Sequence, residues 1–202
     1  MHPCVRVFFA ACLSSTRVLL GCNQPPVTQT ASPAPAAAPQ SPVDRGRLLV
    51  TIGGCHDCHT PKKLGPRGPE ADMSRMLAGH PEEIKITAPF QPATGSPWTI
   101  ATNDLLTAWS GPWGVSFAAN LTPDRNTGTG EGGPWSEELF IKALRTGKHI
   151  GTSRDILPPM PWFNYAEMSD DDLKAIWAFL RSIPAITNHV PDPIPPEGVA
   201  TK

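Results

Sequence analysis

Apolar residues recur at helical spacing in three segments of the chain, and each segment carries helix start or stop signals. The clearest spans residues 169–184, where a serine cap precedes the apolar stripe and a proline ends it. Its apolar positions are Leu173, Ile176, Trp177, Leu180 and Ile183. A second helix is expected over 136–147, ending at a glycine, and a third begins at Ser41 with Pro42 in its first turn.

The pattern disappears in the N-terminal fifth of the chain. Residues 23–42 contain no charged residue and are rich in proline, alanine, serine and threonine. Such a segment has little apolar surface to bury, so we expect residues 22–41 to form an extended tether. The preceding residues 1–21 contain two apolar stretches and are typical of an export signal peptide.

The end of that signal resembles the lipobox of bacterial lipoproteins. Leu19, Leu20 and Gly21 precede Cys22, which in such a motif becomes the first residue and carries lipid. We therefore expect a lipid anchor at Cys22. The alternative is an ordinary secretory signal with a chance cysteine.

Composition narrows the classes of protein further. The chain has 202 residues, 25 prolines and a formal net charge of −1. So many prolines are incompatible with mostly long regular elements, because each removes a backbone donor and fixes φ. The near-zero charge excludes the basic footprint of a nucleic-acid-binding protein. No apolar run approaches the ~18 residues that would span a bilayer, which excludes a polytopic membrane protein.

Five cysteines are present, and their positions in the chain indicate different roles for them. Cys4 and Cys12 fall in the predicted signal, and Cys22 would carry lipid. The remaining pair lies in Cys55-His56-Asp57-Cys58-His59, a C-x-x-C-H motif that is the attachment signature of haem c. The two thiols would form thioethers with the haem, and His59 would bind the iron. The motif occurs once, so one covalent haem is expected.

Other uses of the same cysteines fit less well. A thioredoxin-like pair would follow a strand of a βαβ unit, and the sequence predicts none. A zinc site would need a second ligand pair, whereas His80, His149 and His189 are isolated. A disulfide across two residues would be strained.

A second axial ligand has to come from elsewhere in the chain. Met160 lies in a loop with three prolines, residues 157–162, which would hold a weak iron–sulfur bond at little ordering cost. Met73 and Met76 are expected on one face of a short helix, and Met168 in the core. His80 and His149 remain as alternative ligands.

The order of these features resembles the class I cytochromes c over residues 42–190. Segments 116–124 and 157–184 look like the haem c domains that serve bacterial dehydrogenases. The resemblance implies an all-α fold, with N- and C-terminal helices that cross near Gly46 and pack around one haem. It also implies thioethers at Cys55 and Cys58 and axial ligation by His59 and Met160. Residues 191–202 are expected to form a flexible tail.

The chain departs from that pattern between residues 62 and 115. A long irregular insertion is expected there, directly after the haem motif. Loops of this length are usually functional. The insertion could cover the haem edge as a lid or form a docking surface. Lys148 and Arg154 are further candidates for contacts with the haem propionates.

The sequence thus predicts an electron carrier rather than an enzyme. It would sit in the periplasm on a lipid anchor and pass electrons from a dehydrogenase to a respiratory acceptor, an oxidase or another cytochrome. One alternative is a haem enzyme or gas sensor in which Met160 is displaced and His80 acts as a distal base. A second is a zinc-binding module built on the same cysteines.

Overall fold

The computed structural model of the chain describes residues 40–196. The predicted signal peptide (residues 1–21), Cys22 and nearly all of the predicted tether (residues 22–41) lie outside the described residues. So does the end of the predicted tail, residues 197–202. No helix within residues 40–196 combines the length and the apolar character that crossing a membrane would require.

The three helices predicted from the apolar pattern are present, and their caps are those expected. They are α1 (Pro42–Ile52), α3 (Glu137–Thr146) and α5 (Asp170–Ser182). In each helix, the hydroxyl of the preceding serine accepts a hydrogen bond from the backbone N–H three residues later. The shorter helical segments are α2 (Cys55–His59), η1 (Met73–Arg75), η2 (His149–Gly151) and α4 (Trp162–Tyr165).

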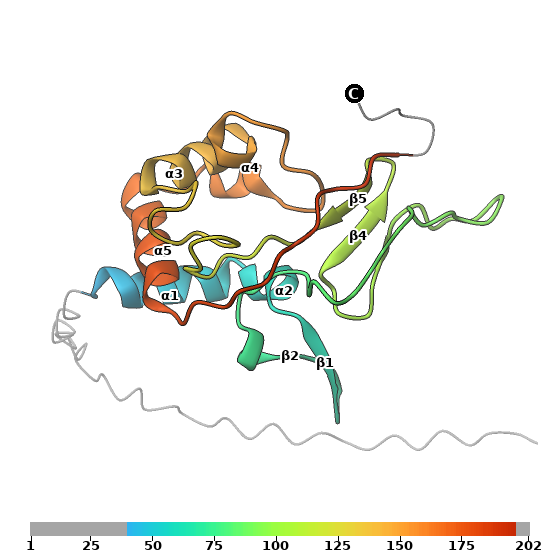
Figure 1. The fold of residues 1–202 in the computed structure, drawn as a ribbon, viewed down its shortest axis with the longest axis horizontal. Helices are drawn as coiled ribbons and strands as arrows, with labels where there is room; N and C mark the ends of the chain where they lie inside the picture. The colour runs from blue at the N-terminus through green and yellow to red at the C-terminus, as the bar shows by residue number, and fades with distance from the viewer. Residues whose placement is uncertain (1–39, 197–202) are drawn as a thin grey trace, which may run out of the picture. The chain divides into compact units, whose positions relative to one another are not determined.

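Helices α1 and α5 cross at Gly46, as the resemblance implied (Figure 1). A Cβ atom at Gly46 would lie 1.9 Å from the carbonyl oxygen of Ala175 and 2.8 Å from Cβ of Phe179. Only glycine permits this approach. The two helices meet in the apolar core, which α3 and α4 also contribute to. Its fully buried members include Val50, Leu77, Leu173 and Leu180.

The predicted all-α fold is wrong. Residues 40–196 form two antiparallel sheets beside the helices, and two of the five α-helices have five residues or fewer. The first sheet pairs β1 (Lys62–Gly65) with β2 (Gly68–Ala71). The second has the order β3-β4-β5, with β3 at Ala101–Thr102, β4 at Ala108–Gly111 and β5 at Gly114–Phe117. The domain therefore mixes α and β structure and does not have the all-α fold of a class I cytochrome.

These strands lie in the segment 62–115 that was expected to be irregular, although most residues of that segment are outside them. The strands are short, and glycine, proline and lysine interrupt any apolar alternation. No period-two pattern therefore predicts a strand in this segment. The expectation for the methionines of this segment also fails in part. Met73 begins η1 but is 56% exposed, whereas Met76 packs against the core, so the two do not share one buried face.

The segment after α5 returns along the sheet. Val115 and Ile194 exchange two backbone hydrogen bonds, of 2.8 and 2.9 Å, in an antiparallel bridge. A Cβ atom at Gly114 would lie 2.0 Å from the carbonyl oxygen of Ile194. The described part of the expected flexible tail, residues 191–196, is thus held against β5.

Candidate functional site

Helix α2 is a single turn that presents the C-x-x-C-H motif. Cys55, Cys58 and His59 stand at positions i, i+3 and i+4, which share one side of a helix. The turn before them needs its two glycines. Gly54 has a φ of 69°, and a Cβ atom at Gly53 would lie 2.8 Å from the carbonyl oxygen of Leu49. The local sequence therefore fixes the direction in which α2 leaves α1.

The two thiols of the motif are free and partly buried. Burial raises the pKa of Cys55 to about 11 and also raises the pKa of Cys58. Reactive redox cysteines and zinc ligands need the thiolate, which a lowered pKa supplies. Among the described residues, no group of three histidine, cysteine or acidic side chains could hold a metal ion. The raised thiol pKa values therefore do not favour a reactive, thioredoxin-like pair.

His59 is held in one orientation and one tautomer. Its Nδ1 donates a hydrogen bond of 2.8 Å to the backbone carbonyl of Ala119. The proton therefore lies on Nδ1, and Nε2 keeps its lone pair. Burial lowers the pKa of His59, opposed by the bond to Ala119, so the ring is neutral at pH 7. A neutral imidazole whose other nitrogen is bonded to a carbonyl is the usual state of a histidine that binds a metal.

The loop of Met160 is tied to the same region by a bond on each side. Before the methionine, the Ser116 hydroxyl donates to the carbonyl oxygen of Pro158 at 2.5 Å. After it, the buried Tyr165 donates from its hydroxyl to the carbonyl oxygen of Gly53 at 2.5 Å. Met160 itself is partly buried against the core, as is Cys55. Burial raises the pKa of Tyr165 to about 12, and its neighbours Cys55 and Cys58 add to that rise.

One short segment contacts both predicted ligand regions. Ser116, in β5, bonds to the methionine loop, and Ala119, three residues later, bonds to His59. The strand and the residues after it therefore set the His59 ring and the Met160 loop relative to each other. The 116–124 segment was singled out in the sequence, but its bonds to residues 60 and 42 positions away carry no sequence signal.

The other candidate ligands are engaged elsewhere. His80 is fully buried, with Nδ1 3.0 Å from the Thr107 hydroxyl and Nε2 3.0 Å from the Ile84 carbonyl oxygen. Neither of its nitrogens is available to iron. His149 packs edge-on against Trp135, at 5.3 Å between ring centres. Met168 packs against the core, as predicted.

The candidates for a propionate contact differ in their partners. Lys148 forms an ion pair of 2.5 Å with Asp155. Arg154 is exposed, and its guanidinium donates a hydrogen bond of 3.2 Å to the backbone carbonyl of Asp155. In these contacts, neither Lys148 nor Arg154 bonds to α2 or to the methionine loop.

One buried donor of the sheet was missed in the sequence. The indole Nε1 of Trp109, in β4, is buried and has no hydrogen-bond partner among residues 40–196. Trp109 and Ser116 are paired across β4 and β5, so both side chains lie on one face of the sheet. Two thiols and a neutral imidazole on one helical turn fit a group that offers vinyl carbons and a metal, as haem does.

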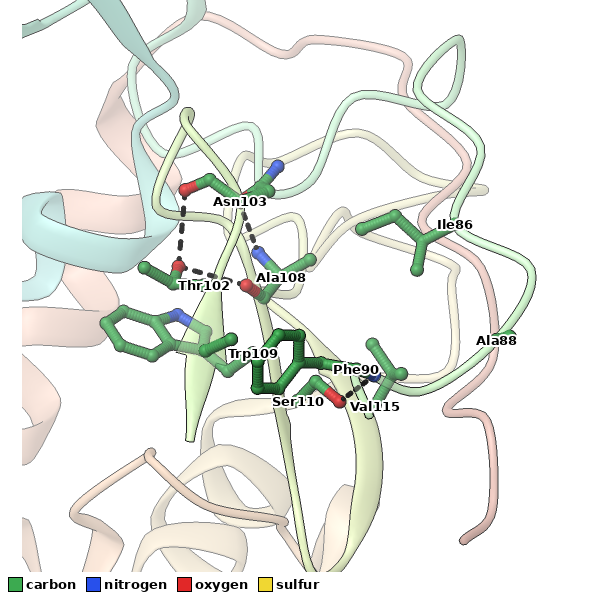
Figure 2. Close-up of a pocket in the computed structure, with 10 residues that line it drawn as sticks. Ile86, Ala88, Phe90, Thr102, Asn103, Ala108, Trp109, Ser110 and Val115 are labelled. Atoms are coloured by element: carbon green, nitrogen blue, oxygen red, sulfur yellow. Dashed lines mark hydrogen bonds between the residues drawn. The ribbon is translucent and has the colours of Figure 1, made fainter. Parts of the chain in front are cut away.

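Two cavities lie apart from the cysteines of the motif and the predicted axial ligands. One, of about 220 Å³, opens between the 86–90 loop and strands β3 and β4 (Figure 2). The other, of about 310 Å³, is lined by Trp135, Trp177 and Arg181 among others. Neither is lined by Cys55, His59 or Met160, so neither marks the candidate site.

No family model matches the chain. It is 26% identical over 177 residues to the fructose dehydrogenase cytochrome subunit of Gluconobacter japonicus, which covers 88% of this chain and 28% of that protein. It is 32% identical over 138 residues to the gluconate 2-dehydrogenase cytochrome c subunit of Pantoea cypripedii, covering 68% of this chain and 22% of the relative.

A third relative is the cytochrome c subunit of the quinone alcohol dehydrogenase of Gluconobacter oxydans. It is 36% identical over 85 residues, 40% of this chain and 17% of the relative. The chain thus spans less than a third of each of these proteins. With the geometry of the C-x-x-C-H turn, these matches show that the chain carries a cytochrome c-like domain related to the cytochrome subunits of bacterial dehydrogenases.

Proposed function

We propose that this chain is an electron carrier that binds one haem c. Cys55 and Cys58 would attach the haem through thioethers, and His59 and Met160 would be the axial ligands of its iron. When bound, the haem supplies a reversible one-electron couple. The observation that carries the proposal is the His59 ring, whose Nδ1 bond to Ala119 leaves Nε2 unprotonated on the same helical turn as the two thiols.

The protein's own residues would hold and orient this group. The Ala119 carbonyl keeps the His59 ring from rotating and increases its basicity as a ligand. The bonds from Ser116 to Pro158 and from Tyr165 to Gly53 hold the methionine loop close to the turn that carries Cys55. A thioether ligand on a fixed loop raises the reduction potential, which suits an electron carrier.

An electron carrier is favoured over a haem enzyme or gas sensor by the state of His80. That alternative needs a free distal base, and His80 was its candidate. The ring is buried in a hydrogen-bonded contact with Thr107 and Ile84, both in the insertion. It supports the packing of that segment instead.

The setting follows from the relatives and from the N-terminal sequence. Their names describe subunits of dehydrogenases, so we place a dehydrogenase as the electron donor and a respiratory oxidase or cytochrome as the acceptor. The predicted signal peptide over residues 1–21 and the lipobox-like cysteine Cys22 support a periplasmic location with a lipid anchor in the membrane.

The test is the absorption spectrum of protein matured with haem c, first oxidised and then reduced. Haem that stays with the denatured chain, at one per chain, tests the thioethers. The weak near-infrared band of thioether-ligated ferric haem is expected in the wild type and should disappear in Met160→Ala. It should persist in Met73→Ala and Met168→Leu. A wild type without this band, or a band that survives in Met160→Ala, would overturn the ligation by Met160.

A further inference from the structure

The insertion contains a segment that projects from the domain with most of its side chains exposed. This arm, residues 86–100, comes before β3, and Figure 1 shows it as the green loop that extends past β4. Phe90 is 46% exposed, Trp98 73% and Ile100 48%. Tryptophan is highly buried on average, and a cluster of exposed apolar side chains indicates a contact surface.

Hydrogen bonds at its base and at its tip hold the arm in one conformation. At the base, the Phe90 N–H donates to the Ser110 hydroxyl at 2.7 Å. At the tip, the Ser96 N–H donates to the Ala93 carbonyl oxygen at 2.9 Å, and the Ser96 hydroxyl accepts from the Trp98 N–H at 3.1 Å. Three prolines between residues 89 and 97 restrict φ further. The exposed side chains are thus presented by a constrained turn, which lowers the entropy cost of a contact.

The arm carries no charge. No acidic or basic residue occurs between Lys85 and Asp104. The whole chain has a formal net charge of −1, so it has no basic excess that would draw it to anionic lipid headgroups. A face of this domain that meets a membrane has to do so through uncharged apolar residues. Tryptophan is the residue type that favours the membrane–water interface.

We infer that this arm inserts into the headgroup region of a lipid bilayer, with Trp98 as its main contact. The inference rests on the proposed function, because the lipid anchor at Cys22 brings the domain to a membrane. The chain from Cys22 to Ser41 can span at most ~65 Å. The anchor therefore keeps the arm within reach of the surface and gives it a high effective concentration there. Of the two roles considered for the insertion, the arm then performs that of a docking surface.

The size and form of the arm favour lipid over a protein partner. A standard protein interface buries about 800 Å² on each partner. Three partly exposed side chains on one turn of chain offer on the order of 300–400 Å². A fluid bilayer needs no surface of matched shape, and the small residues at 93–96 fit between headgroups. Backbone groups of the turn stay hydrated at that depth, whereas the hydrocarbon core would not tolerate them.

The test places a nitroxide label at the tip of the arm through Thr94→Cys. In the mature, haem-loaded chain the native cysteines would carry lipid or haem, so the label reacts with the introduced thiol alone. The full chain is reconstituted in vesicles of phosphatidylethanolamine and phosphatidylglycerol. Collisions of the label with oxygen, which concentrates in lipid, are then compared with collisions with a water-soluble nickel chelate.

We expect the label at residue 94 to collide mainly with oxygen. The matched control is Leu64→Cys, on the hairpin of β1 and β2, where the native side chain is 89% exposed. A label there should collide mainly with the chelate. Trp98→Ser, added to Thr94→Cys, should move the label from lipid to water, whereas Leu64→Ser should not. The visible spectrum of each variant reports whether its haem site is intact.

The outcomes separate this inference from the proposed function. If the label at residue 94 collides mainly with the chelate while the protein stays on the vesicles, the inference fails and the lipid anchor stands; an arm that docks on a protein would give this result. If the label stays in lipid after Trp98→Ser, Trp98 is not the main contact and the inference fails in that form. If the chain carries no lipid and washes off the vesicles, the anchor and the inference fail together, and the haem spectrum still decides electron transfer.

Discussion

The sequence predicted the crossed helices α1 and α5 but not the strands of the insertion. Both regions border the candidate site. The helices begin and end where the sequence indicates. The insertion was expected to lack regular structure and instead contains β1 to β4 and the beginning of β5. The difference lies in how clearly the residues of each element carry the sequence pattern of that element.

The helices rest on contacts within a few residues. Ser41, Ser136 and Ser169 each accept a hydrogen bond from an N–H three positions later, and this spacing is visible in any sequence. The apolar stripe of α5 adds a period that only a helix satisfies. The crossing of α1 and α5 near Gly46 was expected from the resemblance, and the structure shows that this contact leaves no room for a side chain.

The strands pair with near neighbours in short hairpins, but their residues carry no strand pattern, and some of their bonds reach distant parts of the chain. The N–H of Lys62 donates to the Leu105 carbonyl at 3.1 Å, and Val115 pairs with Ile194. Strand β2 reads Gly-Pro-Glu-Ala and strand β4 reads Ala-Trp-Ser-Gly, neither of which alternates in the way a half-buried strand does. Sequence patterns did not reveal these strands, because four-residue segments without apolar alternation give no period-two signal.

The largest effect is expected from a substitution at the helix crossing. Gly46→Ala places a Cβ atom 1.9 Å from a backbone oxygen of Ala175, and backbone cannot move aside as a side-chain end can. The helices must separate, so we expect a loss of about 3 kcal/mol or more in the free energy of unfolding. Denaturant unfolding of the haem-loaded protein measures it.

The matched control is a glycine of the insertion, Gly65. A Cβ atom there meets only the carboxyl end of the Glu70 side chain, at 2.3 Å, which can swing into solvent. Gly65→Ala should change the stability by less than about 1 kcal/mol. Equal losses in the two variants would show that the crossing at Gly46 is not the tight contact described here.

The candidate site, like the fold, has one part that the sequence predicts and another that it does not. The thiols and His59 follow from a five-residue motif, and the prolines around Met160 mark its loop. The groups that orient them were not predictable, because Ala119 acts through its backbone carbonyl and Ser116 through a loop 42 residues away. Tyr165 was overlooked as well, although it is the single tyrosine of the chain.

A medium effect is expected at the point that joins the insertion to the C-terminal segment. Asn188 is 1% exposed, and its amide donates to the carbonyl oxygens of Ala78 and His80 at 2.6 and 2.9 Å. Its side-chain oxygen accepts from the Glu82 N–H at 2.9 Å. Asn188→Ala removes the partner of all three backbone groups, two of which are in buried bonds, so we expect a loss of about 2 kcal/mol.

Hydrogen exchange locates that loss. In Asn188→Ala the amides of residues 78–84 should exchange faster, while those of α1 and α5 keep their relative protection. The exposed Asn126 gives the control, since Asn126→Ala should leave both sets unchanged. Faster exchange throughout the domain would mean that insertion and helices unfold as one unit, and the contrast between the two regions would not extend to their stability.

The smallest effect tests the bond that joins the methionine loop to the haem motif. Tyr165→Phe removes the hydrogen bond to the Gly53 carbonyl, which should lower the free energy of unfolding by about 1 kcal/mol. Phe163→Leu, at an exposed position of the same helix, should cost almost nothing.

The pKa of Tyr165 is raised to about 12 in the folded protein, against ~10 in an unfolded chain. Between these values the unfolded chain loses its phenol proton while the folded protein keeps it, so wild-type stability should fall as the pH rises through this range. Because there is one tyrosine, the ultraviolet absorbance of the phenolate reports this group alone. Tyr165→Phe should lack that part of the alkaline loss, and identical losses in the two proteins would contradict a buried, hydrogen-bonded hydroxyl beside Cys55.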